Sequence, residues 1–142
     1  MVSKEVENLL LKVQKQGGYV GGELNEVIKD KKKVDCRFAF CFPDTYEVGM
    51  SHLGMKILYS LMNAVPYIWC ERVFAPWVDM EEEMIKHNIP LYALESGDPV
   101  FDFDFIGFTL QYELSFTNML NMLRLSGVPI KSCDRKELKN IV

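Results

Sequence analysis

Three largely apolar runs occur along the chain and are separated by segments with helical spacing. The runs are "RFAFCF" at residues 37–42, "YIWCERVFA" at residues 67–75 and "FIGFTL" at residues 105–110. A short continuous apolar run is typical of a strand that is buried on both faces, because side chains on each side of the sheet then meet a covering layer. The pattern therefore predicts three central strands.

Helical periodicity follows each of these runs. The spacing predicts helices within residues 50–62, 76–88 and 115–127, the last capped by Ser115 and ended by Gly127. We expect the first of these helices to turn Met50, Leu53, Ile57, Leu58, Leu61 and Met62 toward the core, and the third to turn Phe116, Met119, Leu120 and Leu123 inward.

The N-terminal part of the chain predicts a further helix and a flexible connector. Ser3 is a candidate N-cap, and Val6, Leu9, Leu10 and Val13 recur at helical spacing before Gly17 and Gly18 end the pattern. The glycines of residues 17–22 are expected to form a connector rather than a phosphate cradle, because no strand precedes them. We thus divide the chain into a helix and Gly-rich connector at 1–34 and one α/β domain at 35–142.

The alternation of strands and helices predicts the fold class. Crossovers of this length impose parallel pairing, which gives a three-layer, doubly wound α/β domain of the Rossmann-like or flavodoxin-like kind with a mainly parallel sheet, preceded by an N-terminal helix. Three main strands are few for this class. We therefore expect a sheet that lacks its last strands at the C-terminal side.

Composition narrows the class of partners. The 142 residues are 49% apolar, and sixteen basic against twenty acidic side chains give a net charge of −4. This balance disfavours a nucleic-acid partner. No apolar run approaches the roughly 20 residues of a membrane span, and the first residues lack a signal-peptide layout, so we expect a cytoplasmic protein without a membrane partner.

Cysteines and histidines offer no recognisable catalytic or metal-binding pattern. Cys36, Cys41, Cys70 and Cys133 lack the two-residue gap of zinc or redox motifs, so reduced thiols are expected. His52 stands near a predicted helix start without a paired ligand, which favours a structural or solvent-facing role. We therefore expect no catalytic residue and no metal site in this chain.

A ligand site is expected where the parallel strands end. In such a sheet, ligands collect outside the carboxyl ends of the strands, which brings together the loops at 43–49, 75–77 and 111–115. Asp44 projects from the first strand, Gly49 permits close approach of backbone, and amides near Ser51 are expected to open a helix toward an anion. The alternative, in which Asp44 only caps its own turn, remains open.

Two blocks carry a family resemblance. "FPDTYEVGMSHLG" and "GFTLQYELSFTN", within a likeness that extends from about residue 17 to 135, resemble the N-terminal region of radical S-adenosylmethionine proteins that carry a cobalamin-binding-type domain before the radical domain. The resemblance implies a cobalamin-binding-like module, not catalytic by itself, whose partner is the downstream radical domain of the same polypeptide. It implies cofactor contacts at Asp44, Thr45, Tyr46, Glu47, Gly49, Ser51, Thr109, Gln111 and Tyr112.

The sequence departs from the histidine-ligated cobalamin motif D-x-H-x-x-G. Asp44 is followed by Thr45 and Tyr46, and His52 lies eight positions beyond Asp44, so cobalamin is expected without a histidine ligand. A 4Fe–4S cluster and S-adenosylmethionine belong to the downstream domain in this interpretation. The alternatives are a ligand-free structural or docking domain of the same fold and, with weaker support, a flavin or phosphate-ligand domain. A truncated sheet edge also predicts self-association.

Overall fold

The computed structural model describes residues 4–136, 138 and 141–142, so the predicted cap at Ser3 lies outside the described residues. Its sheet contains β1 (Cys36–Phe42), β2 (Ile68–Phe74) and β3 (Phe105–Phe108), in the order β2-β1-β3. Both pairings are parallel, with Phe38 of β1 opposite Cys70 on one side and Phe105 on the other. The three strands predicted from the apolar runs are confirmed.

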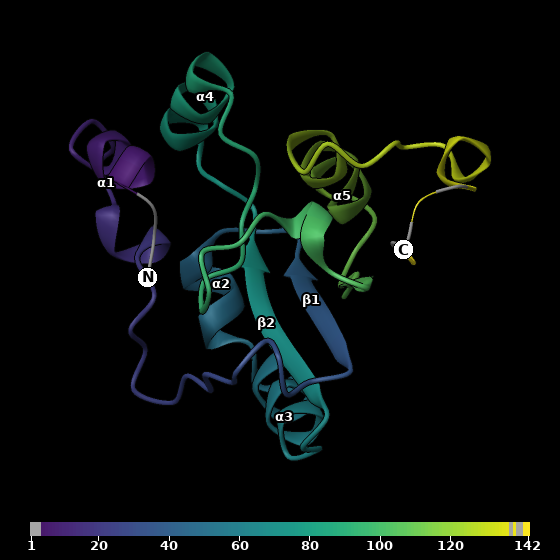
Figure 1. Cartoon of the computed structure of the whole chain (residues 1–142). Helices are drawn as coiled ribbons and strands as arrows, with labels where there is room; N and C mark the ends of the chain where they lie inside the picture. Colours follow the sequence, from purple (N-terminus) through teal and green to yellow (C-terminus); the bar gives the residue numbers. More distant parts are fainter. Residues whose placement is uncertain (1–3, 137, 139–140) are drawn as a thin grey trace.

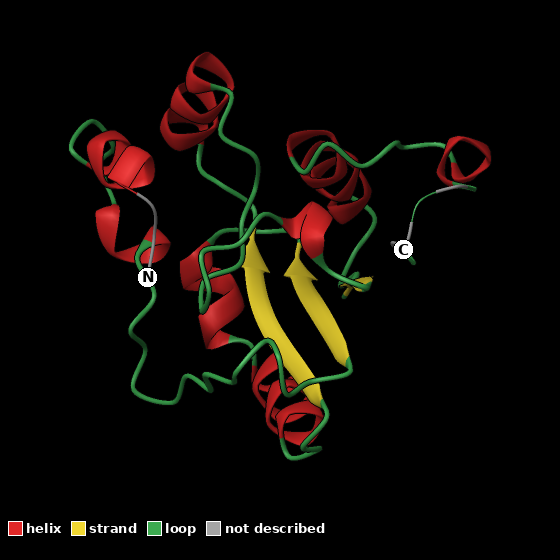
Figure 2. Ribbon diagram, viewed as in Figure 1, coloured by secondary structure: helices red, strands yellow, loops and turns green. Residues whose placement is uncertain are grey.

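Helices cover both faces of this sheet (Figure 1). On one face lie α2 (Tyr46–Ser51) and α3 (Leu53–Asn63), and on the other lie α1 (Lys4–Leu10), α4 (Val78–His87) and α5 (Ser115–Leu125). Figure 2 shows how loops join the strand ends to these helices, with short 3-10 turns η1 (Gln16–Tyr19), η2 (Val100–Asp102) and η3 (Ser132–Arg135). The three-layer α/β class is therefore confirmed.

Alternate residues of β1 enter two separate hydrophobic clusters. Ala39 and Cys41 pack with residues of α1, α4 and α5, whereas Phe40 and Phe42 pack with Met55 of α3 and its neighbours. Both faces of β1 are thus buried, because side chains alternate along a strand. This double burial is the physical reason for the nearly continuous apolar run in the sequence.

The strand order locates a switch point in the topology. The chain crosses from β1 to β2 over the α3 face and then returns past β1 to β3 over the α4 face. The loops after β1 and β3 therefore lead to helices on opposite faces of the sheet. The order β2-β1-β3 is the one found at the start of flavodoxin-like sheets, where ligands bind between the first and third strands.

A short parallel pairing extends this order beyond β3. Ile141 forms a parallel bridge with Phe105, its amide donating to the Asp104 carbonyl at 2.9 Å while its own carbonyl accepts from the Ile106 amide at 2.8 Å. The sequence pattern contained no strand signal in this C-terminal segment. Ile141 therefore marks the position of a fourth parallel neighbour at the outer edge of β3.

The predicted inward face of α3 is wrong at four positions, whereas Met50 and Met62 do pack against the core as predicted. The four exposed residues are Leu53, Ile57, Leu58 and Leu61. Met55 and Tyr59 are buried against the sheet, whereas Ile57, Leu58 and Leu61 point outward, and Leu61 is 61% exposed. The backbone leaves helical geometry at His52, where φ is −80° and ψ is 111°, so α3 starts with its own phase instead of continuing the pattern from Met50. The prediction treated residues 50–62 as one continuous helix, and so it grouped Met50 with side chains of α3 that point to solvent.

The prediction for α5 needs a similar correction. Met122, Leu123 and Leu125 are buried, but Phe116 and Leu120, which were expected to point inward, are exposed. Ser115 is the first residue of the helix rather than its cap, since the N-cap position belongs to Leu114. An apolar stripe on each of α3 and α5 is consequently left on the surface.

The N-terminal helix contributes directly to the core. Val6, Leu9, Leu10 and Val13, which the helical spacing had selected, are buried together with Met80 and Met84 of α4. Tyr19 of η1 extends this contact, because its hydroxyl accepts from the Trp77 amide at 3.0 Å and its carbonyl accepts from the Tyr92 hydroxyl at 3.1 Å. The segment preceding β1 thus packs on the face that carries α4.

Candidate functional site

Asp44 and Tyr112 meet across the switch point at the carboxyl ends of β1 and β3. The Tyr112 hydroxyl donates to Oδ2 of Asp44 at 3.2 Å, and this carboxylate raises the pKa of Tyr112. The other oxygen, Oδ1, accepts from the Thr45 amide at 2.7 Å. Asp44 therefore bonds both within its own turn and to the loop after β3, and its role as a ligand contact stays a prediction.

Thr109 and Gln111 lie in the same loop as Tyr112. The Gln111 side-chain amide donates to the Thr109 hydroxyl at 2.5 Å, while the Thr109 backbone amide donates to the Cys41 carbonyl at 3.2 Å. Asn118 of α5 was not selected from the sequence, yet its side chain donates to the Pro43 carbonyl at 2.9 Å. The bonds from Thr109 to Cys41 and from Asn118 to Pro43 connect the segment after β3 to the end of β1.

Tyr46 and Glu47 face the N-terminal segment instead. The Tyr46 hydroxyl donates to the Glu23 carboxylate, and its ring meets the Phe74 ring edge-on with centroids 5.5 Å apart. Burial, followed by the bond to Glu23, raises the pKa of Tyr46 to about 12. Glu47 forms an exposed ion pair with Lys15 at 2.8 Å, which lowers its pKa.

Gly49 and Ser51 have structural surroundings. A Cβ atom at Gly49 would lie 2.2 Å from the buried Phe74 ring, so the close approach that glycine permits here is to an aromatic side chain. Ser51 ends α2, and its hydroxyl donates to the Glu47 carbonyl at 2.7 Å. Ser51 itself does not open a helix, but α3 begins two residues later at Leu53, within the region where a helix start was predicted.

His52 has the structural role that the sequence favoured. Its Nδ1 accepts from the Met55 amide at 3.1 Å, which makes His52 the N-cap of α3. Its ring also packs on Phe42, with centroids 5.3 Å apart.

Exposed apolar side chains also occur on the segments that follow the three strands. Each of the three strands is followed by at least one of them, and Leu114 is 73% exposed. Exposed apolar side chains that gather into one patch commonly mark a binding surface. We call these residues the apolar platform: Val48, Trp77, Val78, Leu110, Tyr112, Leu114 and Phe116.

Two ion pairs that involve β2 residues were not predicted from the sequence. Glu71 accepts from Arg37 on one face of the sheet, and Arg72 donates through Nε to Glu95 at 2.6 Å on the other. Glu71 and Glu95 are fully buried, and burial raises the pKa of both carboxyl groups. The available signal was a charged dipeptide inside the apolar run at 67–75.

A family model described as radical SAM proteins, N-terminal, matches residues 54–142, which is more than half of the chain. The chain belongs to this family. The match includes β2, β3 and the loop of Thr109, Gln111 and Tyr112, whereas Asp44 lies before its first residue. Membership in a radical SAM N-terminal family supports the expected module of a larger radical SAM protein.

Searches of curated proteins and of solved structures each gave no significant match to this radical SAM N-terminal chain. Among the described residues, no helix combines the length and apolar character needed to cross a membrane. Within the same part of the chain, histidine, cysteine and acidic side chains do not gather in groups of three or more that suit a metal ion. The four cysteines are free, with Cys41 and Cys70 buried.

Proposed function

We propose that this radical SAM N-terminal chain is a non-catalytic module that holds cobalamin between its apolar platform and the radical domain of the same polypeptide. The observation that supports the proposal is that exposed apolar side chains follow each of the three parallel strands, whose carboxyl ends lie at the same end of the sheet. A corrin ring is large and flat, and such an open apolar surface suits it better than a deep pocket does. The carboxyl edge at a switch point is also the preferred ligand position in this fold class.

The polar groups beside the platform fit the amide-rich rim of a corrin. Asp44 offers a carboxylate and Thr109 and Gln111 offer hydroxyl and amide groups, with Tyr112 between them. Four of the nine expected contacts are engaged elsewhere, namely Tyr46, Glu47, Gly49 and Ser51. The proposed contacts are therefore the remaining five: Asp44, Thr45, Thr109, Gln111 and Tyr112. When bound, cobalamin supplies organometallic chemistry at its cobalt, without His52 as a ligand because that ring caps α3.

A spectral titration of the full-length protein with hydroxocobalamin tests this proposal. We expect a saturable change in the cobalamin absorption bands. Tyr112→Ala and Trp77→Ala should each weaken binding by about tenfold, equivalent to ~1.4 kcal/mol, because each removes an exposed aromatic surface from the platform. Tyr67→Ala is the matched control, because the exposure of Tyr67 is similar to that of Trp77 and Tyr112. Tyr67 precedes β2 and therefore lies at the opposite, amino-terminal end of the strands.

Absence of saturable binding by the wild-type full-length protein would refute the cofactor assignment. Equal weakening by Tyr67→Ala would place the ligand elsewhere. A protein that is yellow on purification and releases flavin would instead favour the flavin alternative, which uses the same switch point between β1 and β3.

A docking module without a ligand is the second candidate, and one observation favours it. Both oxygens of Asp44 already accept hydrogen bonds within the chain, and Tyr46 is bonded to Glu23. The apolar platform would then bind the radical domain directly. In that case Tyr112→Ala should weaken domain association while the full-length protein takes up no hydroxocobalamin.

A further inference from the structure

A cavity that shares no lining residue with the platform lies between the connector and α3. Its volume is about 570 Å³, within the range of roughly 300–1,000 Å³ that is typical of small-molecule sites. The lining comes from the connector, from α2 and α3 and from the middle of β2, and includes Val27, Met50, Met55, Tyr59, Ser60 and Arg72. Neither Asp44 nor Tyr112 belongs to it.

Arg72 is the charged group of this cavity, and its side chain is only 6% exposed. Its Nε donates to Glu95, and the guanidinium carbon lies 4.5 Å from the centre of the Tyr59 ring. Its Nη1 has only a weak acceptor, the sulfur of Met50 at 3.3 Å. Its Nη2 has no hydrogen-bond partner among the residues that the structure describes.

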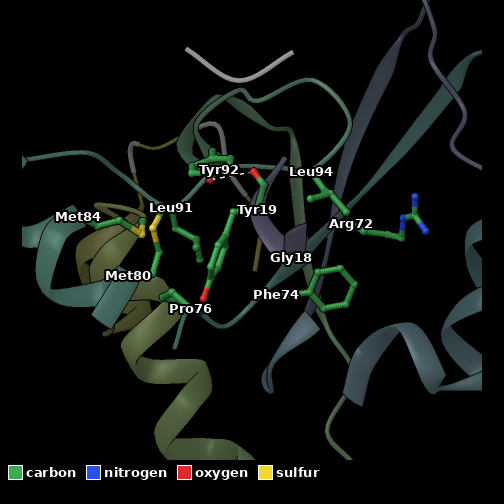
Figure 3. A pocket seen from close by; sticks show the side chains of 10 residues that line it. All are labelled: Gly18, Tyr19, Arg72, Phe74, Pro76, Met80, Met84, Leu91, Tyr92 and Leu94. Carbon is green, nitrogen blue, oxygen red and sulfur yellow. Dashed lines mark hydrogen bonds between the residues drawn. The ribbon is translucent and has the colours of Figure 1, made fainter. Parts of the chain in front are cut away.

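The direction of the side chain is visible in Figure 3, which shows a small neighbouring cavity of about 20 Å³. Tyr19, Met84 and Leu91 line that small cavity, and the guanidinium of Arg72 points away from them. The nitrogen atoms are therefore directed toward the α3 side, where Met50 and Tyr59 contact them. Buried polar donors are almost always satisfied in folded proteins, so an orphaned guanidinium nitrogen beside a large cavity indicates a missing acceptor.

The charges around the cavity indicate which acceptor suits it. Glu95 offsets one positive charge, and Glu23, which also lines the cavity, is bonded to Tyr46. Lys56 adds a cation at the exposed side of the cavity. Arg72 and Lys56 together balance Glu95 and Glu23, so a ligand with a single negative charge fits the cavity better than a doubly charged phosphate, which would meet twice the repulsion of Glu23.

We propose that this cavity binds a small apolar carboxylate, with the carboxylate accepting from the guanidinium of Arg72 and the apolar body lying along Met50, Met55 and Tyr59. A guanidinium and a carboxylate form a charge-assisted hydrogen bond, which is stronger than a neutral one. The connector forms one wall, so binding would couple the ligand to the N-terminal segment. This site is independent of the cobalamin proposal, because the two share no residue.

Isothermal titration calorimetry of the full-length protein with octanoate tests the inference, with octanamide as the uncharged ligand of the same shape. We expect saturable octanoate binding and at least about tenfold weaker binding of octanamide, because the charge-assisted bond is lost. Ser60→Phe fills the cavity from an exposed position of α3 and should abolish binding. Ile57→Phe, on the same helix but outside the cavity, should bind octanoate as the wild type does.

Four outcomes would overturn the inference. Octanoate that shows no binding up to millimolar concentration excludes the site, and equal affinity for octanamide excludes the role of Arg72. Unchanged binding by Ser60→Phe places the ligand elsewhere. Tighter binding of octyl phosphate than of octanoate contradicts the single-charge argument.

Discussion

Glu71 and Arg72 are consecutive residues of β2 and therefore point to opposite faces of the sheet, where each has a buried partner of opposite charge. Glu71 accepts from Arg37, whose guanidinium carbon lies 4.2 Å from the centre of the Phe103 ring. Arg72 pairs with Glu95, which also accepts from the Arg72 amide at 2.7 Å. These pairs fix the loop around residues 95–98 against β2.

The Arg72–Glu95 pair gives a prediction for stability. Glu95→Ala should lower the free energy of unfolding by about 3–5 kcal/mol, because removal of one partner leaves a buried charge uncompensated. Urea denaturation followed by circular dichroism measures the change. Glu82→Ala, at an exposed position of α4, is the control and should stay within about 0.5 kcal/mol of the wild type. A similarly small loss for Glu95→Ala would show that the pair contributes little.

At the scale of elements, the break at His52 decides which side chains face the sheet. It separates the short α2, which carries Gly49, from α3, which packs through Met55 and Tyr59. Gly49 lets α2 lie directly on the rings of Phe42 and Phe74, since an added Cβ would come within 3.2 Å of one and 2.2 Å of the other. The position of α2, and with it the turn of Asp44, depends on this contact.

Gly49→Ala tests the close packing of α2. We expect a loss of about 1–3 kcal/mol in the free energy of unfolding, because the methyl group must displace the Phe74 ring in a filled core. Thermal unfolding of the purified variant measures it. Gly17→Ala is the matched control, since nothing lies within 4 Å of a Cβ at that position. If both variants melt alike, α2 does not depend on this contact.

At the scale of the whole molecule, the sheet has unequal edges. Leu94 donates its amide to the Arg72 carbonyl at 2.8 Å and so covers part of the outer edge of β2. At the outer edge of β3, Ile141 bridges to Phe105, and past Ile106 no strand within the described part of the chain continues the pairing. Unpaired strand edges favour pairing with another chain.

We therefore expect the isolated 142-residue chain to self-associate through the edge of β3, and multi-angle light scattering should show mass that rises with concentration. Ile57→Lys combined with Leu61→Lys removes the exposed apolar stripe of α3 and serves as the control. Association that persists in this variant supports the sheet edge. Monomeric material at all concentrations, or association abolished by the two lysines, would contradict it.

The sequence alone determined the three strands, their parallel pairing and the helices between them. Nearly continuous apolar runs reflect strands that are buried on both faces, and helical spacing reflects helices that are buried on one face. It also indicated that the loops after β1 and β3 meet, as Asp44 and Tyr112 do. Only the tertiary structure decided the outward face of α3, the partner of Tyr46 and the unpaired nitrogen of Arg72. These features depend on the residue at which a helix starts and on contacts between residues far apart in the chain. Neither can be deduced from the local periodicity of the sequence.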